Sequence, residues 1–237
     1  TSANTTASAI SIIGDASNAN SSASEGVWAG LSTLEITATG EGGGIAITST
    51  SGVNDPETIN FHGHTYILAD SGDITITASG GSANAKFTIT NARNFHLGST
   101  SADNTTNDII TSSANITLDA RDRGYFWNVD TIGEPNFKTS GTVSVLTTNY
   151  GFNKTWITLD PGVSGLTLGS AGNPGNISID EATTVAGPIT LNGVDVTIGS
   201  ALTATNSTIT LNGSGSITDG AAITASNLLL NGTGSYT

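Results

Sequence analysis

Residues 188–193 read PITLNG and residues 208–213 read TITLNG, so the pentapeptide ITLNG occurs twice, at 189–193 and at 209–213. A related pentapeptide, LLLNG, follows at 228–232, after almost the same interval. Self-similarity at a fixed period is typical of chains that stack one supersecondary unit on the next. The fold therefore depends on which unit fills one such period.

One period contains three short triplets, in which two apolar residues flank a polar one: 189–191 (ITL), 196–198 (VTI) and 202–204 (LTA). Alternation places the apolar residues of a triplet on one face and Thr on the other. We interpret the Asn-Gly pair after 189–191 as a turn. Because a three-residue strand cannot bury its apolar face alone, copies must stack. The pattern predicts an all-β fold, a parallel β-helix with about 20 residues per coil.

Triplets of the same kind occur upstream at less regular intervals, and we expect residues 1–237 to form a single β-helix segment of roughly nine coils. No stretch of a dozen residues shows a 3.6-residue period, so no long helix is expected. The upstream triplets are 34–36, 45–47, 74–76, 87–89, 116–118, 143–145, 157–159, 166–168 and 177–179.

The charged residues and the apolar residues limit the kinds of partner that the chain can bind. Six Lys and Arg residues stand against 19 Asp and Glu residues, giving a formal net charge of −13. Since no cluster of basic residues exists, we expect no nucleic-acid partner. No apolar run approaches the length of a membrane span, so we expect no transmembrane segment. The chain has no Cys and no Met, and we interpret it as a piece of something longer.

Two stretches, 54–68 and 120–156, depart from the repeat. The second holds most of the aromatic residues and is predicted to be an aromatic-rich, extra-helical insertion or a set of irregular coils. Exposed aromatic rings stack on sugars and anchor protein contacts. Tyr125, Trp127 and Trp156 are therefore the candidate ligand-binding residues. The alternative is that these rings form a small satellite core under the insertion.

Three groups of residues have the side chains that catalysis or metal binding would need. Residues 119–123 (DARDR) offer acids beside bases, as a polysaccharide lyase needs, but also fit a solvated charged turn. Asp180 and Glu181 are adjacent and would point to opposite faces of a strand, unlike a glycosidase pair. His62 and His64 could supply two zinc ligands, although no Cys exists to join them. We expect no enzyme activity, no catalytic residue, no metal and no cofactor.

The segments ITLNG, VTIGS and LTATNSTITLNGSGSITDG resemble the central repeat region of filamentous-haemagglutinin-like exoproteins, the large bacterial adhesins of two-partner secretion. The resemblance is good over roughly the last third of the chain and looser over the rest. It implies a right-handed β-helix, export through an outer-membrane barrel, and roles in adhesion, biofilm formation and virulence. Residues 173–176 (NPGN) lack the NPNG-type signature of the family's secretion domain, which places this chain in the body of such a protein.

The leading hypothesis is a rigid β-solenoid segment of a secreted or cell-surface adhesin that mediates attachment or spacing. Its expected partners are host-cell or matrix glycans or proteins, the secretion barrel during export, and flanking coils of the same polypeptide, which would cover the open strand edges. One alternative is a subunit or segment of an extracellular filament or matrix. A further alternative is a polysaccharide-active β-helix enzyme.

Two other features leave alternatives open. Thr-x-Thr pairs such as Thr75/Thr77 also occur on ice-binding β-helices, but here the pairs do not recur at one fixed coil position. β-Propensity on a solvent face is the simpler explanation. Nine Asn-x-Ser/Thr sequons leave glycosylation open, in only slight excess over what composition gives.

Overall fold

The computed structural model describes residues 10–16, 18, 26–29, 34–38, 43–51, 57–62, 65–69, 72–80, 86–90, 95–98, 115–120, 126–128, 136–147 and 151–237. These residues form 26 strands and one short 3-10 helix, η1 (Lys154–Trp156). Every strand pairing among them is parallel. Within this part of the chain there is no helix with the length and hydrophobicity of a membrane span.

Nine coils are stacked, and the first strand of every coil belongs to one unbroken nine-stranded sheet. We call this sheet the first face. Its strands, in spatial and chain order alike, are β1 (Ile10–Asp15), β4 (Ile45–Ser51), β7 (Ile74–Gly80), β10 (Ile116–Ala120), β13 (Thr142–Thr147), β16 (Gly165–Leu168), β19 (Ile189–Gly193), β22 (Thr208–Gly213) and β25 (Asn227–Asn231).

The second and third strands of the coils form the second and third faces, and each of these faces is divided into two sheets. The second face consists of β2 (Val27–Ala29), β5 (Glu57–His62), β8 (Lys86–Thr90) and β11 (Phe126–Asn128), then of β14 (Phe152–Asn153), β17 (Ile177–Ile179), β20 (Val196–Ile198), β23 (Ser216–Asp219) and β26 (Ser235–Tyr236). The third face consists of β3 (Leu34–Ala38), β6 (Thr65–Ala69), β9 (Phe95–Gly98), β12 (Asn136–Lys138) and β15 (Thr158–Leu159), then of β18 (Thr183–Val185), β21 (Leu202–Ala204) and β24 (Ile223–Thr224).

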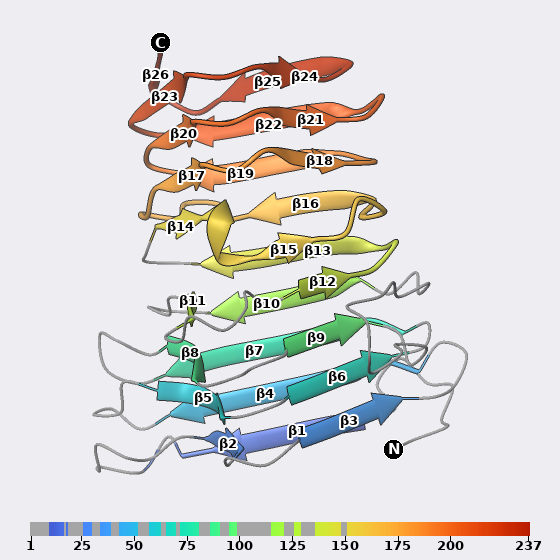
Figure 1. The fold of residues 1–237 in the computed structure, drawn as a ribbon. Coiled ribbons are helices and arrows are strands. Elements are labelled where there is room, and N and C mark those ends of the chain that lie inside the picture. The colour runs from blue at the N-terminus through green and yellow to red at the C-terminus, as the bar shows by residue number, and fades with distance from the viewer. Residues whose placement is uncertain are drawn as a thin grey trace.

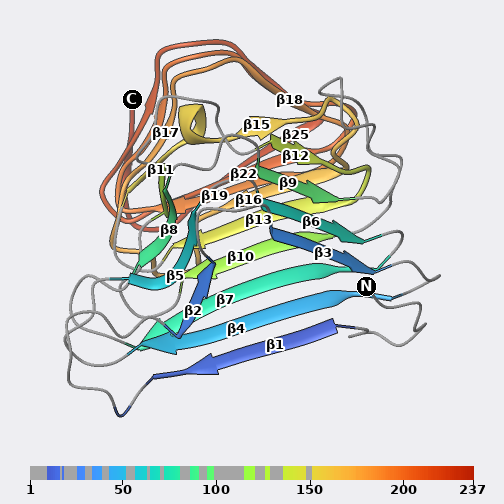
Figure 2. The same cartoon turned by 60° about the horizontal axis from the view of Figure 1, so that its bottom comes forward.

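The coils rise from the N-terminal end at the bottom of Figure 1 to the C-terminal end at the top. Viewed from the C-terminal end, the chain passes counterclockwise from the first face to the second and third while it rises towards the viewer (Figures 1 and 2). This is a right-handed parallel β-helix, as predicted.

The core lies inside the stack and is built from the outer residues of the triplets. On the first face two inward columns run through all nine coils, and within β4 to β22 their residues are almost wholly buried. Each such side chain contributes roughly 1.5–3 kcal/mol by leaving water. The first column is Ile10, Ile45, Ile74, Ile116, Val143, Leu166, Ile189, Ile209 and Leu228.

The middle residue of each triplet on the first face points outward, and from β7 to β22 it is half-buried. Over these strands the position is always Thr or Ser: Thr75, Thr117, Ser144, Thr167, Thr190 and Thr210. The residues two positions further along do not continue the pattern, because the partner of Thr77 is Asp119. A single Thr column thus persists, as β-propensity predicts for a solvent face, whereas paired Thr columns do not.

Coil length is nearly constant only towards the C-terminus. There Ile189 pairs with Ile209, and Ile209 pairs with Leu228, at almost equal intervals along the chain. Upstream of Ile189, successive partners in the same column are further apart in sequence and unevenly spaced. Because the described strands stay short throughout, the additional residues lie in the sequence between the described strands. The expected coil length therefore holds for 189–228, and upstream coils are longer.

The interpretation of Asn-Gly as a turn is wrong for the two ITLNG copies. Asn192 and Gly193 are the last residues of β19, and Asn212 and Gly213 are the last residues of β22. Positive φ among the described glycines occurs at Gly169, Gly172 and Gly232 only. A Cβ at Gly213 would lie 2.7 Å from Cγ1 of Ile217. Glycine thus allows close packing at the corner of the coil, where a larger residue would force the Ile217 side chain to shift.

The segment 120–156 contains described strands of the solenoid. The strands β11, β12, β13 and β14 pair in parallel with neighbouring coils, and η1 follows β14. The predicted insertion therefore concerns 121–125, 129–135 and 148–150, which lie outside the described residues. Likewise 54–68 contains β5 and most of β6, which belong to the stack.

Candidate functional site

Two of the three aromatic candidates, Trp127 and Trp156, belong to successive coils. Trp127 is the middle residue of β11, where it pairs with Thr88 of β8. Trp156 is the last residue of η1, between β14 and β15 of the next coil. Tyr125 lies outside the described residues. Ligand binding by these three residues stays a prediction.

Trp28 is an exposed aromatic residue that the sequence pattern did not single out. It is the middle residue of β2, and its side chain is 61% exposed. Its coil, which begins at Ile10 and ends where Ile45 begins the next one, is much longer than the repeat, so no regular spacing marked this residue. The one signal in the sequence was the residue type, because Trp is rare in this chain, which has three Trp residues in all.

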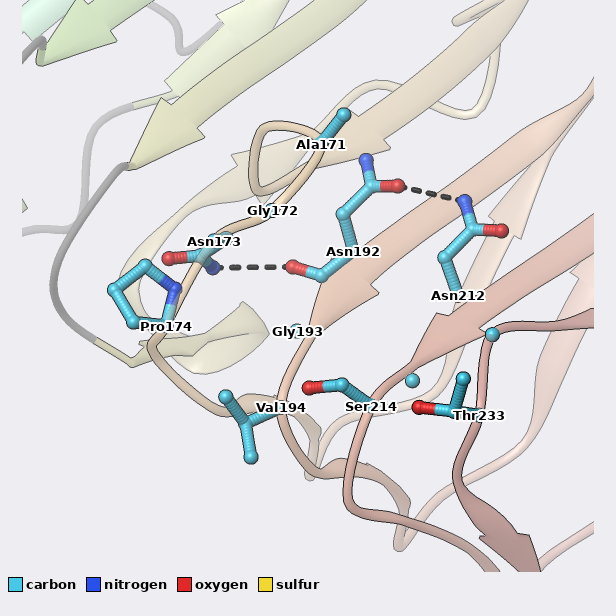
Figure 3. A pocket seen from close by; sticks show the side chains of 12 residues that line it. Ala171, Gly172, Asn173, Pro174, Asn192, Gly193, Val194, Asn212, Ser214 and Thr233 are labelled. Carbon is cyan, nitrogen blue, oxygen red and sulfur yellow. Dashed lines mark hydrogen bonds between the residues drawn. The ribbon is translucent and has the colours of Figure 1, made fainter.

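A groove of about 580 Å³ lies at the corner between the first and second faces (Figure 3). It is lined by residues 171–174, 192–194, 212–214 and 232–233, which come from four successive coils. None of its lining residues is titratable, so the groove offers no general acid or base. It could hold a ligand by neutral hydrogen bonds alone.

Asn192 and Asn212 line the groove and belong to a column of asparagines on the first face, which Asn231 continues by strand register. Asn212 Nδ2 donates to Asn192 Oδ1 at 2.6 Å, as Figure 3 shows. Asn192 Nδ2 in turn donates to the carbonyl oxygen of Gly169 at 2.8 Å. Asn173, from the longer turn after β16, donates to the carbonyl oxygen of Asn192 at 3.0 Å. These amides therefore stabilise the stack of coils by satisfying one another.

A second set of polar contacts lies at the turn before the second face. Asp195 Oδ1 accepts hydrogen bonds of 2.8 Å from both the backbone N–H and the hydroxyl of Ser216. The Asp195 backbone N–H donates to Asn176 Oδ1 at 3.1 Å. The backbone hydrogen bond from Ser216, then its side-chain bond, lowers the pKa of Asp195 below its ordinary value of 3.8. This carboxylate therefore joins adjacent coils in its ionised form.

The adjacent acids Asp180 and Glu181 are both engaged by the preceding coil. Asn153 Nδ2 donates to Asp180 Oδ2 at 2.6 Å, and Lys154 Nζ lies 2.9 Å from Glu181 Oε2. The side chain of Lys154 is 6% exposed and that of Glu181 is 55% exposed. The pair thus connects η1 with the turn after β17, a structural role that its adjacency in the sequence did not indicate.

The other candidate groups fall partly outside the described residues. Asp119 lies in β10, but residues 121–123 are outside the described part. His62 ends β5, and His64 is outside it as well. Among the residues that the structure describes, no three His, Cys, Asp or Glu side chains are grouped as metal ligands.

The last coil leaves apolar residues open to solvent. Leu228, Leu229 and Leu230 of β25 are 45–49% exposed, although Leu228 and Leu230 continue the inward columns of the first face. Tyr236 of β26 is also exposed. This edge therefore presents both a row of backbone hydrogen-bonding groups and an apolar core surface.

Comparison with known proteins adds no relative. No family model matches the chain. No curated protein and no solved structure matches it either. The basis for a functional proposal is therefore the architecture of the molecule and the chemistry of its surface.

Proposed function

We propose that this chain is a rigid β-solenoid segment of a large secreted or cell-surface bacterial adhesin. Its role is to space and to present a contact surface, without catalysing a reaction. The observation that carries the proposal is the unbroken first face, in which nine parallel strands share one continuous core. At about 4.8 Å per strand such a stack is roughly 40 Å long. It is a stiff rod, because every coil pairs with its neighbours.

The polar surface supports a role in contact at the cell exterior. Asn, Ser and Thr side chains connect the coils, and the chain has no Cys, as export through an outer-membrane barrel favours. Host-cell or matrix glycans and proteins are the proposed partners. Tyr125, Trp127 and Trp156 remain candidate contact residues.

Flanking coils of the same polypeptide are the proposed cover for the open edges. The half-exposed Leu228 and Leu230 support this, because a further coil would bury them as Ile209 and Leu211 are buried. A filament of stacked copies is the second candidate, since the same edge could receive another molecule. Head-to-tail stacking would place the short C-terminal coils against the much longer first coil. That mismatch favours flanking coils.

An adhesion assay tests the proposal. Beads coated with the purified chain should be retained on epithelial cells or on a deposited matrix more strongly than beads coated with serum albumin. Equal retention on every surface would contradict an adhesive role. Fibres with a repeat of about 4.8 Å along their axis would favour the filament instead. Release of reducing or unsaturated sugar ends from polyuronides would favour the alternative that the chain is a polysaccharide-active enzyme.

A further inference from the structure

We propose that the groove at the corner between the first and second faces binds a linear neutral oligosaccharide, which lies along the axis of the stack. This inference rests on the proposed adhesive function and names a ligand class and a surface for it. The groove crosses four successive coils, and the structure describes the burial of every residue that lines it. Its availability to a ligand therefore follows from known contacts.

The turn after β16 forms one wall of the groove and is longer than the turns above it. Residues 169–176 separate β16 from β17, whereas only residues 194–195 separate β19 from β20. Asn173, which is 4% exposed, fixes the longer turn. Its Nδ2 donates to the Asn192 carbonyl oxygen, and its Oδ1 accepts from the Gly175 backbone N–H, both at 3.0 Å. This wall is thus formed before any ligand arrives.

The upper coils contribute polar groups that the described part of the fold does not use. Ser214 and Thr233 occupy corresponding positions in successive coils, and both are exposed. Neither hydroxyl group forms a hydrogen bond with another described residue, and Figure 3 shows both hydroxyl oxygens turned to the same side. The half-buried Asn212 adds a side-chain oxygen, because its hydrogen bond to Asn192 uses Nδ2. The groove therefore offers both donors and acceptors.

The residue types and the size of the groove suit a short sugar chain. Hydroxyl and amide groups donate and accept hydrogen bonds, as the hydroxyl groups of sugars also do. Ala171, Pro174 and Val194 provide apolar surface for the C–H faces of sugar rings. The volume of about 580 Å³ lies within the range of roughly 300–1,000 Å³ for small-molecule sites. Since the coils are about 4.8 Å apart, four coils fit an oligosaccharide better than a single sugar.

The direction of the groove disfavours an extended peptide. The groove crosses β19, β22 and β25, which pair with one another, so a peptide along it would meet no free strand edge and could not add as a strand. Proline-rich peptides dock in grooves lined by aromatic side chains, and the residues that line this groove include none. The surface therefore favours a sugar chain.

Charge selects a neutral sugar over an acidic one. No lining residue is charged. The carboxylate of Asp195, which directly follows Val194 in the chain, is held beside the groove by Ser216 of the next coil. The whole chain has a formal net charge of −13. A polyuronide or a nucleic acid would be repelled and would find no basic side chain in the groove.

Isothermal titration calorimetry of the full chain with linear oligosaccharides tests the inference. The probes are chains of glucose, N-acetylglucosamine or mannose, from disaccharides to hexasaccharides, with galacturonate chains as the acidic comparison. Affinity for the preferred neutral series should rise up to about four units, one for each coil, and then level off. Ser214→Ala and Thr233→Ala should each weaken binding about threefold to tenfold, the equivalent of one lost hydrogen bond. Thr233→Ser keeps the hydroxyl group and should retain most of the affinity.

A blocking substitution and its matched control lie in one coil. Ser214→Leu places a bulky apolar side chain at an exposed position of the groove and should weaken binding by more than about tenfold. Thr218 of β23 is also exposed, but it belongs to the second face and does not line the groove. Thr218→Leu should therefore bind like the wild type. Far-UV circular dichroism and thermal melting of all variants separate lost contacts from lost folding.

The outcomes separate this inference from the adhesin proposal. Absence of binding to every neutral series, equal binding of galacturonate chains, or wild-type affinity in Ser214→Leu would overturn the groove as a sugar site. Binding of a neutral peptide rich in Gly and Ser, in place of every sugar, would overturn it too. Retention of coated beads on cells would then still support the adhesive function. Conversely, sugar binding that Ser214→Leu abolishes, without bead retention, would support the groove and remove the adhesin proposal.

Discussion

Replacing Asn192 by Ala tests whether the asparagine column stabilises the stack of coils. The Asn192 side chain is buried, donates to the Gly169 carbonyl at 2.8 Å and accepts from Asn212 Nδ2 at 2.6 Å. The truncation removes both hydrogen bonds. It therefore deprives the Gly169 carbonyl and the Asn212 side-chain amide of their Asn192 partner. The backbone contact from Asn173 to the Asn192 carbonyl is kept, because it does not involve the deleted atoms.

The expected loss of stability depends on how well the Gly169 carbonyl and the Asn212 amide can form hydrogen bonds with water instead. Gly169 is buried, so its unpaired carbonyl should cost about 1–3 kcal/mol, while the half-buried amide of Asn212 should cost about 1 kcal/mol. Together the expected loss is roughly 2–4 kcal/mol. Asn212→Ala removes one of the two bonds, about 1 kcal/mol. Asn231 is exposed, so Asn231→Ala should change stability by no more than about 0.5 kcal/mol.

Urea unfolding followed by far-UV circular dichroism measures the three free energies of unfolding. Because stacked coils can open locally, amide hydrogen exchange of β19 and β22 should accompany it. The expected order of destabilisation is Asn192 first, Asn212 second and Asn231 last, with loss of protection centred on β19. The reasoning is refuted if all three substitutions cost the same, or if Asn231→Ala costs most.

Three further substitutions probe the corner between the first and second faces. Gly169 and Gly172 both have a φ of 76°, but an added Cβ would lie 2.1 Å from the Asn192 carbonyl oxygen at the former and meets nothing within 4 Å at the latter. Gly172→Ala should therefore lower the free energy of unfolding by about 1–2 kcal/mol, because Ala disfavours the left-handed backbone conformation. Gly169→Ala should lower it further, because the added Cβ also clashes. Equal urea midpoints for the two variants would contradict this geometry. Because the folded-state pKa of Asp195 is lowered from 3.8, its ionised form stabilises the fold above that pH. This stabilisation is lost as pH falls through the folded-state pKa, so Asp195→Asn should flatten the decline of melting temperature in acid, and an unchanged decline would exclude Asp195 as its source.

The fold was predictable because the C-terminal coils keep nearly one length. At these almost equal intervals, ITLNG and LLLNG recur visibly and fix both the parallel pairing and the register. Upstream, the strands retain the triplet pattern while the residues between them vary in number. Isolated triplets such as 45–47 and 74–76 could therefore be recognised, but not the pairing between them.

The same variation hides Trp28. Its coil is much longer than the repeat, so no period in the sequence marks this exposed residue of β2. The prediction chose Trp127 because aromatic residues cluster near it, and it missed Trp28, which has no such neighbours.

The asparagines of ITLNG show a different limit of sequence reasoning. Asn followed by Gly is a frequent turn signal, yet Asn192 remains in its strand and its amide bonds to the coils on either side. The short amide side chain of Asn favours turns, and it also favours hydrogen bonding between asparagines stacked in successive coils. Only the repetition of Asn at one coil position distinguishes them, because a stacked amide needs a partner in register and a turn does not.

The fifth coil explains why the first face carries the stiffness of the rod. Its second strand, β14, pairs with β17 above, whereas its third strand, β15, pairs with β12 below. Between these strands lies η1, where the chain crosses from the upper stack to the lower one. Among the strands that the structure describes, only those of the first face pass this point without a break in their backbone hydrogen bonds. The break of the third face lies between β15 and β18, and near it the side-chain bonds of Asn153 and Lys154 connect the fifth coil with the coil above. Bending of the rod should therefore concentrate at this coil, with the first face as its hinge line.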